Sequence, residues 1–344
     1  DARSGGQLMI GDNASSIVLG SGGVGVTTGG FLTVNGPSLP IIITGGGDTA
    51  NRPGSPSEGT IYYDTTTKRL LTYSNGKWQA DRSDAILIAA NNSSQEDKDA
   101  ADYVASGSND GATINTAFAA LPSGGGKVQL MKGTFILGAT NISMPNNTSL
   151  TGVGSGTVIT YPNNMPNATY LAITNTDTTT GTGVTVQNLL IDGNKANQTT
   201  GSFYGIRFNS MGGGSGSGAR MGAKISNVTV KNVYGAFGPG IYLSNSSNNI
   251  VRGNTTLGNT SGIYVFNGNF NNIIGNTTQG NSGTGVTLYT TYQNTISDNT
   301  VQGNGAGIAL TSTANTNTIT GNTITGNTSI GINLSTSGST LISS

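Results

Sequence analysis

A short pattern of apolar and polar positions recurs through the last third of the sequence. The unit is Gly, then Ile or Val, then a variable residue, then Leu or Val; it begins at Gly240, Gly262, Gly285, Gly307 and Gly331. Two series of Asn residues recur at nearly the same spacing as the glycines. One series is Asn232, Asn254, Asn276, Asn299 and Asn322, and the other is Asn259, Asn281, Asn304 and Asn327. Three registers that share one period predict a structural repeat.

Within each unit the apolar residues stand two apart, which indicates short strands. Coils stacked about 4.8 Å apart would place Ile263 on Ile241 and under Val286, and would align the corner Asn residues in hydrogen-bonded ladders. The L-x-x-L-x-L pattern of leucine-rich repeats, which have a similar period, is missing. We therefore predict an all-β fold, with a right-handed parallel β-helix of about 22–24 residues per coil over residues 125–344.

Three segments of different composition precede the repeat. Residues 1–47 are Gly-rich with short apolar runs, and we expect a fibre-like segment that exchanges strands with partner chains. Residues 48–82 combine a Pro/Gly linker with a small β module that ends near Trp78. Residues 83–124 are expected to hold a connector and a capping helix.

The capping helix is predicted from an apolar stripe at helical spacing: Ile114, Ala117, Phe118 and Leu121. Asn109-Asp110 can cap its beginning, and Pro122 with the following glycines ends it.

Composition narrows the function classes. The 344 residues carry no net charge, which argues against a nucleic-acid partner, and no apolar run approaches the roughly 18 residues of a membrane span. The chain has no His and no Cys, so His-dependent triads, thiol chemistry and His-ligated metal sites are excluded. We expect no cofactor and no metal.

Several motifs resemble a known superfamily. Asp102-Tyr103-Val104, Asn109-Asp110-Gly111 and Lys132-Gly133-Thr134-Phe135 resemble the segment that leads into the β-helix of pectate-lyase-like proteins, where a helix plugs the N-terminal end. Many phage tailspikes and tail fibres share this segment. Residues 59–78 look like a small module found before receptor-binding or depolymerase domains in phage tail fibres. The resemblance implies a homotrimer on the virion tail that binds a host cell-surface glycan. A secreted or cell-surface location is the alternative.

The superfamily includes polysaccharide lyases and glycoside hydrolases, so the acidic residues decide whether catalysis is plausible. Hydrolysis needs two carboxylates about 5–9.5 Å apart. After Asp110 the sequence has only Asp177, Asp192 and Asp298. The last two are separated by several coils, roughly 20 Å along the axis. Asp177 could approach Asp192 if they lie one coil apart.

The weak catalytic candidates are therefore Asp192, Asp177 and Arg207. The acid cluster of a Ca²⁺-dependent lyase is absent, and a metal-free lyase could use Arg207, Lys195, Lys231 or Tyr204. Solvated charges on the outer face explain these residues more simply.

An exposed aromatic face is the stronger candidate site. The variable residue of each unit points outward, which gives the column Tyr242, Tyr264, Thr287, Ala309 and Asn333, and Gly205-Ile206-Arg207-Phe208 places Arg207 at its head. Phe266 and Tyr289 point outward two residues further on. We predict that Arg207, Tyr242, Tyr264, Phe266 and Tyr289 bind carbohydrate. Packing against a neighbouring subunit and cover by the insert at 211–218 are the alternatives.

The scarcity of carboxylates favours binding over catalysis. The leading hypothesis is a tailspike or tail-fibre protein that binds a host surface polysaccharide. The second is a depolymerase of the same glycan, either a lyase or a glycoside hydrolase. The third is the structural subunit of an extracellular filament or adhesin, assembled by N-terminal strand exchange and suggested by an incomplete last coil at 340–344.

Overall fold

The computed structural model describes residues 46–343, apart from 55, 57–59, 67–68, 75–76, 81–84, 213–220 and 336–337. The expected fibre-like segment at 1–47 lies outside the described residues except for Gly46 and Gly47. Those two glycines form β1 (Gly46–Gly47), which pairs with the small β module that follows.

The small module is a four-stranded sheet in the order β1-β2-β3-β4, with β2 (Ile61–Asp64), β3 (Arg69–Ser74) and β4 (Lys77–Ala80). A short 3₁₀ turn, η1, spans Thr49–Asn51. Trp78 packs against Tyr62 and Tyr73, with ring centroids 5.6 and 5.4 Å away. The fully buried carboxylate of Asp64 pairs with Arg52 at 2.6 Å. An aromatic cluster and one ion pair thus organise a module too small for a large aliphatic core.

The connector holds β5 (Ala85–Ala89), α1 (Gln95–Ala100), β6 (Tyr103–Val104) and α2 (Asp110–Ala119). Helix α2 confirms the predicted capping helix, and it buries Ile114, Ala117 and Phe118. Asn109 makes no capping hydrogen bond through its side chain. The buried carboxylate of Asp110 instead accepts hydrogen bonds from the N–H groups of Gly107 (2.8 Å) and Ile136 (2.7 Å). Asp110 therefore ties the helix to the first coil.

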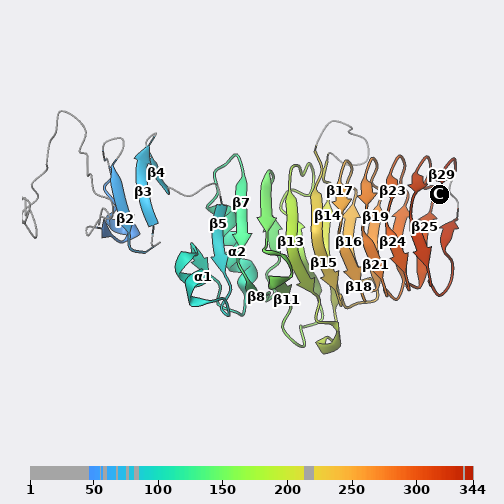
Figure 1. The fold of residues 1–344 in the computed structure, drawn as a ribbon, viewed down its shortest axis with the longest axis horizontal. Coiled ribbons are helices and arrows are strands. Elements are labelled where there is room, and N and C mark those ends of the chain that lie inside the picture. Colours follow the sequence, from blue (N-terminus) through green and yellow to red (C-terminus); the bar gives the residue numbers. More distant parts are fainter. Residues whose placement is uncertain are drawn as a thin grey trace, which may run out of the picture. The chain divides into compact units, whose positions relative to one another are not determined.

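The repeat forms a right-handed parallel β-helix, as predicted (Figure 1). The predicted coil length of 22–24 residues holds from Ile241 onward. Earlier coils are longer, because register partners Ile142, Ile173, Ile206 and Ile241 follow one another at 31, 33 and 35 residues. One wall is an eight-stranded sheet: β9 (Ile142–Met144), β12 (Thr169–Asn175), β14 (Ser202–Asn209), β16 (Pro239–Ser244), β19 (Ser261–Phe266), β22 (Thr284–Tyr289), β25 (Ala306–Thr311) and β28 (Ile332–Leu334).

The other walls belong to a seventeen-stranded sheet that also includes β5 and β6. Its early strands are β7 (Gly126–Leu130), β8 (Gly133–Ile136), β10 (Thr148–Thr151), β11 (Thr157–Thr160), β13 (Thr185–Asp192) and β15 (Lys224–Lys231). Its later strands are β17 (Ile250–Arg252), β18 (Thr255–Leu257), β20 (Asn272–Ile274), β21 (Thr277–Gln279), β23 (Thr295–Ser297), β24 (Thr300–Gln302), β26 (Thr318–Thr320), β27 (Thr323–Thr325) and β29 (Leu341–Ser343). Two 3₁₀ turns, η2 (Gly154–Gly156) and η3 (Lys195–Asn197), lie at corners.

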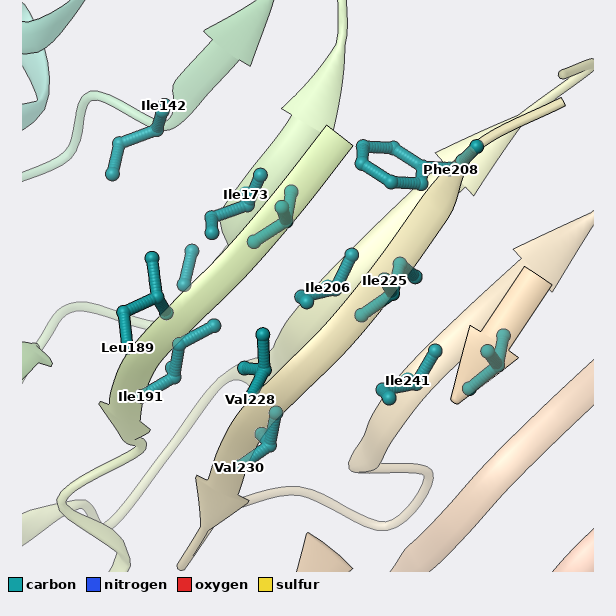
Figure 2. Packing of buried hydrophobic residues seen from close by; sticks show 14 of the residues in the cluster. Ile142, Ile173, Leu189, Ile191, Ile206, Phe208, Ile225, Val228, Val230 and Ile241 are labelled. Carbon is teal, nitrogen blue, oxygen red and sulfur yellow. The ribbon is translucent and has the colours of Figure 1, made fainter. Parts of the chain in front are cut away.

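The core consists of aliphatic ladders that face each other across the coil. Ile263 pairs in register with Ile241 on one side and Val286 on the other, as the sequence predicted. Figure 2 shows Ile173, Ile206 and Ile241 from one sheet, and Ile191, Ile225 and Val228 from the other. All of these side chains are at most 1% exposed. Burial of one such side chain contributes about 1.5–3 kcal/mol.

At two of the units, the opening glycine marks a close approach between coils. A Cβ at Gly262 would lie 2.2 Å from the carbonyl oxygen of Gly285, and one at Gly307 would lie 2.1 Å from that of Gly331. A larger residue would push neighbouring coils apart and break the pairing of the eight-stranded sheet.

Corner Asn residues form three ladders along the later coils, buried except at Asn322 and Asn327: Asn249, Asn271, Asn294 and Asn317; Asn254, Asn276, Asn299 and Asn322; and Asn259, Asn281, Asn304 and Asn327. Asn276 shows the bonding. Its Oδ1 accepts from both the backbone N–H and the Nδ2 of Asn254 (2.9 and 3.0 Å). Its own N–H and Nδ2 donate to Oδ1 of Asn299 (2.8 and 2.9 Å), and its Nδ2 also donates to the carbonyl of Val251 (2.8 Å).

One predicted column is wrong at its first member. The N–H of Val228, not of Asn232, donates to Oδ1 of Asn254 (3.0 Å). Asn232 instead occupies a left-handed corner at φ 55°. The reason is that β15 runs unbroken for eight residues, whereas later coils insert an Asn that splits the same wall into two strands.

We predict that Asn276→Asp destabilises the protein because the carboxylate keeps the acceptor but loses both Nδ2 donors, and because it faces the oxygens of Val251 and Asn299. Urea unfolding at neutral pH should show a loss of about 3 kcal/mol or more. Gln279→Glu introduces the same charge at an exposed position of β21 and should change stability by less than about 0.5 kcal/mol. Equal stability of the two variants would contradict the ladder's role.

Candidate carbohydrate-binding face

The outward column of the eight-stranded sheet carries the predicted residues in register. Arg207 pairs with Tyr242, and Tyr242 pairs with Tyr264 on the next strand. Phe266 and Tyr289 pair two positions further along β19 and β22. All five residues are partly exposed. Parallel pairing in register therefore places the five residues on one face.

Arg207 lies between two tyrosine rings. Its guanidinium carbon is 5.2 Å from the ring centroid of Tyr204 and 5.6 Å from that of Tyr242. The two rings are themselves 5.8 Å apart and tilted by 33°. A cation over aromatic faces at this distance is held by the ring quadrupoles. The arrangement fixes the guanidinium against the sheet.

Phe237 joins this group, although no sequence pattern predicted it. Its ring makes edge contacts with Tyr242 (5.6 Å) and Tyr264 (5.0 Å) and lies 6.1 Å from Tyr204. It stands in a loop before β16, outside the repeating unit, so no periodicity pointed to it. We call Tyr204, Arg207, Phe237, Tyr242 and Tyr264 the Arg207 cluster.

Phe266 and Tyr289 form a second aromatic element. Their rings stack at 5.4 Å with an interplanar angle of 22°. Their strands, β19 and β22, are neighbours, so the pair continues the face toward the C-terminal coils. Aromatic faces of this kind bind the apolar faces of sugar rings, and tyrosine hydroxyls add hydrogen bonds.

Burial shifts the pKa of two tyrosines on this face. It raises the pKa of Tyr264 to about 12, and the neighbouring Tyr242 and Tyr289 add to this shift. Burial also raises the pKa of Tyr204, against the opposing pull of the Arg207 cation. Both hydroxyls therefore stay protonated at neutral pH. They suit hydrogen bonding to sugar hydroxyls better than proton abstraction.

The two candidate acids are committed to structural contacts. Asp177 accepts hydrogen bonds from Asn146, Thr179 and Thr180, which hold the pKa of its carboxyl well below its usual range. Asp192 pairs with Lys231 at 3.1 Å and accepts from the N–H of Asn194 (3.0 Å).

The structure does not bring these carboxylates together. Asp177 accepts a hydrogen bond from Asn146, just before β10, and β10 pairs with the first residues of β13. Asp192 lies at the other end of that eight-residue strand, which spans about 23 Å. Of the lyase candidates, Tyr204 contacts Arg207, whereas Lys231 pairs with Asp192 and Lys195 reaches the carbonyl of Gly258.

The described residues contain no cluster of three or more acids that would hold a metal ion. No helix in the described part of the chain is long and apolar enough to cross a membrane.

These features define the class: a parallel β-helix repeat protein with an exposed aromatic face. A family profile described as periplasmic copper-binding protein (NosD) matches residues 171–344, half of the chain, and the chain belongs to that family. No curated protein matches the sequence.

The residues present do not fit the copper in the family's description. Soft or imidazole ligands suit copper, but the chain lacks His and Cys. Among its six Met, the thioethers of Met144, Met165 and Met211 are packed in the apolar core, and Met221 stands exposed. No step through copper follows for this protein.

Several solved structures are similar. The A-module of the Azotobacter vinelandii mannuronan C-5 epimerase AlgE4 is 17% identical in sequence. The similarity covers 68% of this chain and 91% of the A-module, with a TM-score of 0.38. Tailspike protein 2 of Escherichia coli bacteriophage CAB120 is 15% identical in sequence. The similarity covers 79% of this chain and 42% of the tailspike, with a TM-score of 0.49. The Acinetobacter baumannii phage AM24 tailspike is 14% identical in sequence. The similarity covers 80% of this chain and 49% of the tailspike, with a TM-score of 0.42. At these values no activity is transferred from them.

We predict that Tyr264 contributes to loss of stability at high pH. Its pKa in the folded protein is about 12, above the ordinary value of 10, so the neutral hydroxyl favours the folded state below pH 10. That contribution is lost as the pH rises from 10 to 12. Tyr264→Phe should therefore lose less stability than the native protein over this interval, measured by urea unfolding at each pH. Identical slopes for both proteins would contradict the shift.

Proposed function

We propose that this protein binds a polysaccharide of a host cell surface through the Arg207 cluster and the Phe266–Tyr289 pair. The observation that carries the proposal is the unbroken contact of Tyr204, Phe237, Tyr242 and Tyr264 on an outward face. Each of these side chains remains partly exposed instead of joining the core.

A stack of coils suits a linear polymer. Each strand of the eight-stranded sheet adds one outward position to the same column, about 4.8 Å further along the axis. The rings at Tyr242 and Tyr264 therefore offer successive contacts to successive sugars. A polymer held by several weak stacking contacts gains affinity without a deep pocket.

Placement on a phage tail, as a tailspike or tail-fibre protein, is supported by the order of the segments. A Gly-rich segment with short apolar runs precedes the aromatic β module, and the β-helix follows. The N-terminal apolar runs are too short to bury a core alone, which favours a homotrimer. An extracellular or cell-surface location fits the same features.

Binding is supported over depolymerisation because the candidate acids are engaged elsewhere. Asp177 stabilises its own turn, and Asp192 is neutralised by Lys231. The raised pKa values of Tyr204 and Tyr264 oppose a role as general base. A lyase would release unsaturated products from the glycan, and a hydrolase would release new reducing ends without them.

We predict that Tyr242→Ala and Tyr264→Ala each weaken binding to capsule or lipopolysaccharide from a sensitive host by about tenfold, because each removes a stacking contact of about 1–1.5 kcal/mol. Affinity would be measured by biolayer interferometry on the immobilised glycan. Leu257→Ala, at an exposed apolar position of β18, serves as the control and should bind normally. Unchanged binding by both tyrosine variants would refute the proposed face.

We also predict that the intact chain sediments as a trimer at micromolar concentration. Analytical ultracentrifugation provides the mass directly. A stable monomer would rule out the assembly, and a trimer that dissociates in Tyr242→Ala would show that the aromatic face is a subunit interface instead of a glycan site.

A further inference from the structure

The net charge of the chain is zero, but positive and negative residues are distributed unequally along it. Residues 125–344 carry eight Lys and Arg against three Asp, a net charge of +5. Residues 1–124 carry seven Lys and Arg against twelve Asp and Glu, a net charge of −5. The coils from residue 125 onward are therefore cationic, and they attract anionic polymers over a distance of about 8 Å at physiological salt.

The aromatic face concentrates this charge at one residue. The eight strands of the eight-stranded sheet contain a single charged side chain, Arg207, and no acid. Arg207 has no ion pair among the described residues. By contrast, Lys231 on the other sheet is neutralised by Asp192.

The geometry around Arg207 suits an anionic group on a sugar. Two rings hold the guanidinium carbon at 5.2 and 5.6 Å, which limits the side-chain freedom lost on binding. A guanidinium presents parallel N–H donors that match both oxygens of a carboxylate. Tyr242 touches both Arg207 and Tyr264, so a sugar stacked there would have its acidic group beside the guanidinium.

We propose that the glycan is an acidic polysaccharide, and that Arg207 binds the anionic group of a sugar stacked on Tyr242. This inference rests on the proposed function and specifies its ligand class. The carboxylate of a uronic acid and the sulfate of a sulfated sugar present the same oxygens to the guanidinium, and the experiment separates the two sources.

The test uses the intact chain and a panel of polysaccharides at physiological salt. Alginate, polygalacturonate and hyaluronan are each offered in native and carboxyl-reduced form, with dextran and dextran sulfate beside them. We expect binding to at least one native uronate polymer, and a loss of tenfold or more on reduction of its carboxyl groups. Preference for dextran sulfate over every uronate polymer would assign the anionic group as sulfate.

Three variants make the assignment specific. Arg207→Gln should weaken binding to the acidic polymer by about 10- to 100-fold, the effect of losing a charged hydrogen-bonding partner. Arg207→Lys keeps the charge without the paired donors, so its affinity should lie between those of the native protein and Arg207→Gln. Arg252→Gln removes the same charge from an exposed position on β17, in the other sheet, and should change affinity by less than threefold.

The outcomes separate this inference from the proposed function. If Tyr242→Ala weakens binding but Arg207→Gln does not, or if carboxyl-reduced and native polymers bind equally, the face binds glycans and the anionic assignment is overturned. Equal losses in Arg207→Gln and Arg252→Gln would show diffuse charge attraction and would also overturn it. Binding to no member of the panel, nor to host glycan, would overturn both.

Discussion

The whole structure depends on one constraint: each coil must pass its backbone hydrogen-bonding groups to the next coil. Strands of two to eight residues are too short to be stable alone, so pairing in parallel register supplies both hydrogen bonds and core. At the corners, where strand pairing stops, the side chain of Asn replaces the backbone partner. Asn276 links three successive coils in this way, through Asn254, Asn299 and the carbonyl of Val251.

The aromatic face results from the same parallel register between coils. Because inward residues must stack like on like, outward residues at the same position also align, and the rings of Tyr242 and Tyr264, one coil apart in the sequence, come within 5.5 Å. No pocket is needed to assemble the site. The result is a row of partly exposed rings along neighbouring strands, the arrangement on which the proposed polymer ligand rests.

The chemistry of the coils limits what this surface does. The solenoid carries few carboxylates, and the two considered for catalysis stabilise corners. The family's description names copper, but the sequence lacks His and Cys, and three of its Met are packed in the core. Family membership thus describes the repeat and its stacking, and the residues on the outer face must be considered separately in each member.

Periodicity alone determined the β-helix, the length of its later coils and the stacking of Ile241, Ile263 and Val286, because each depends on a local pattern repeated at constant spacing. The earlier coils are longer and break that spacing, so the alignment of Arg207 with Tyr242 was predicted from the shared four-residue motif and not from the period. The period misleads at Asn232, where the one-coil spacing to Asn254 is fortuitous. It also runs through the ladder that begins at Asn249, which was not predicted. Only the tertiary structure placed Phe237 among the tyrosines and separated Asp177 from Asp192. Those placements depend on loop paths and strand lengths between the repeats, which carry no period to extrapolate.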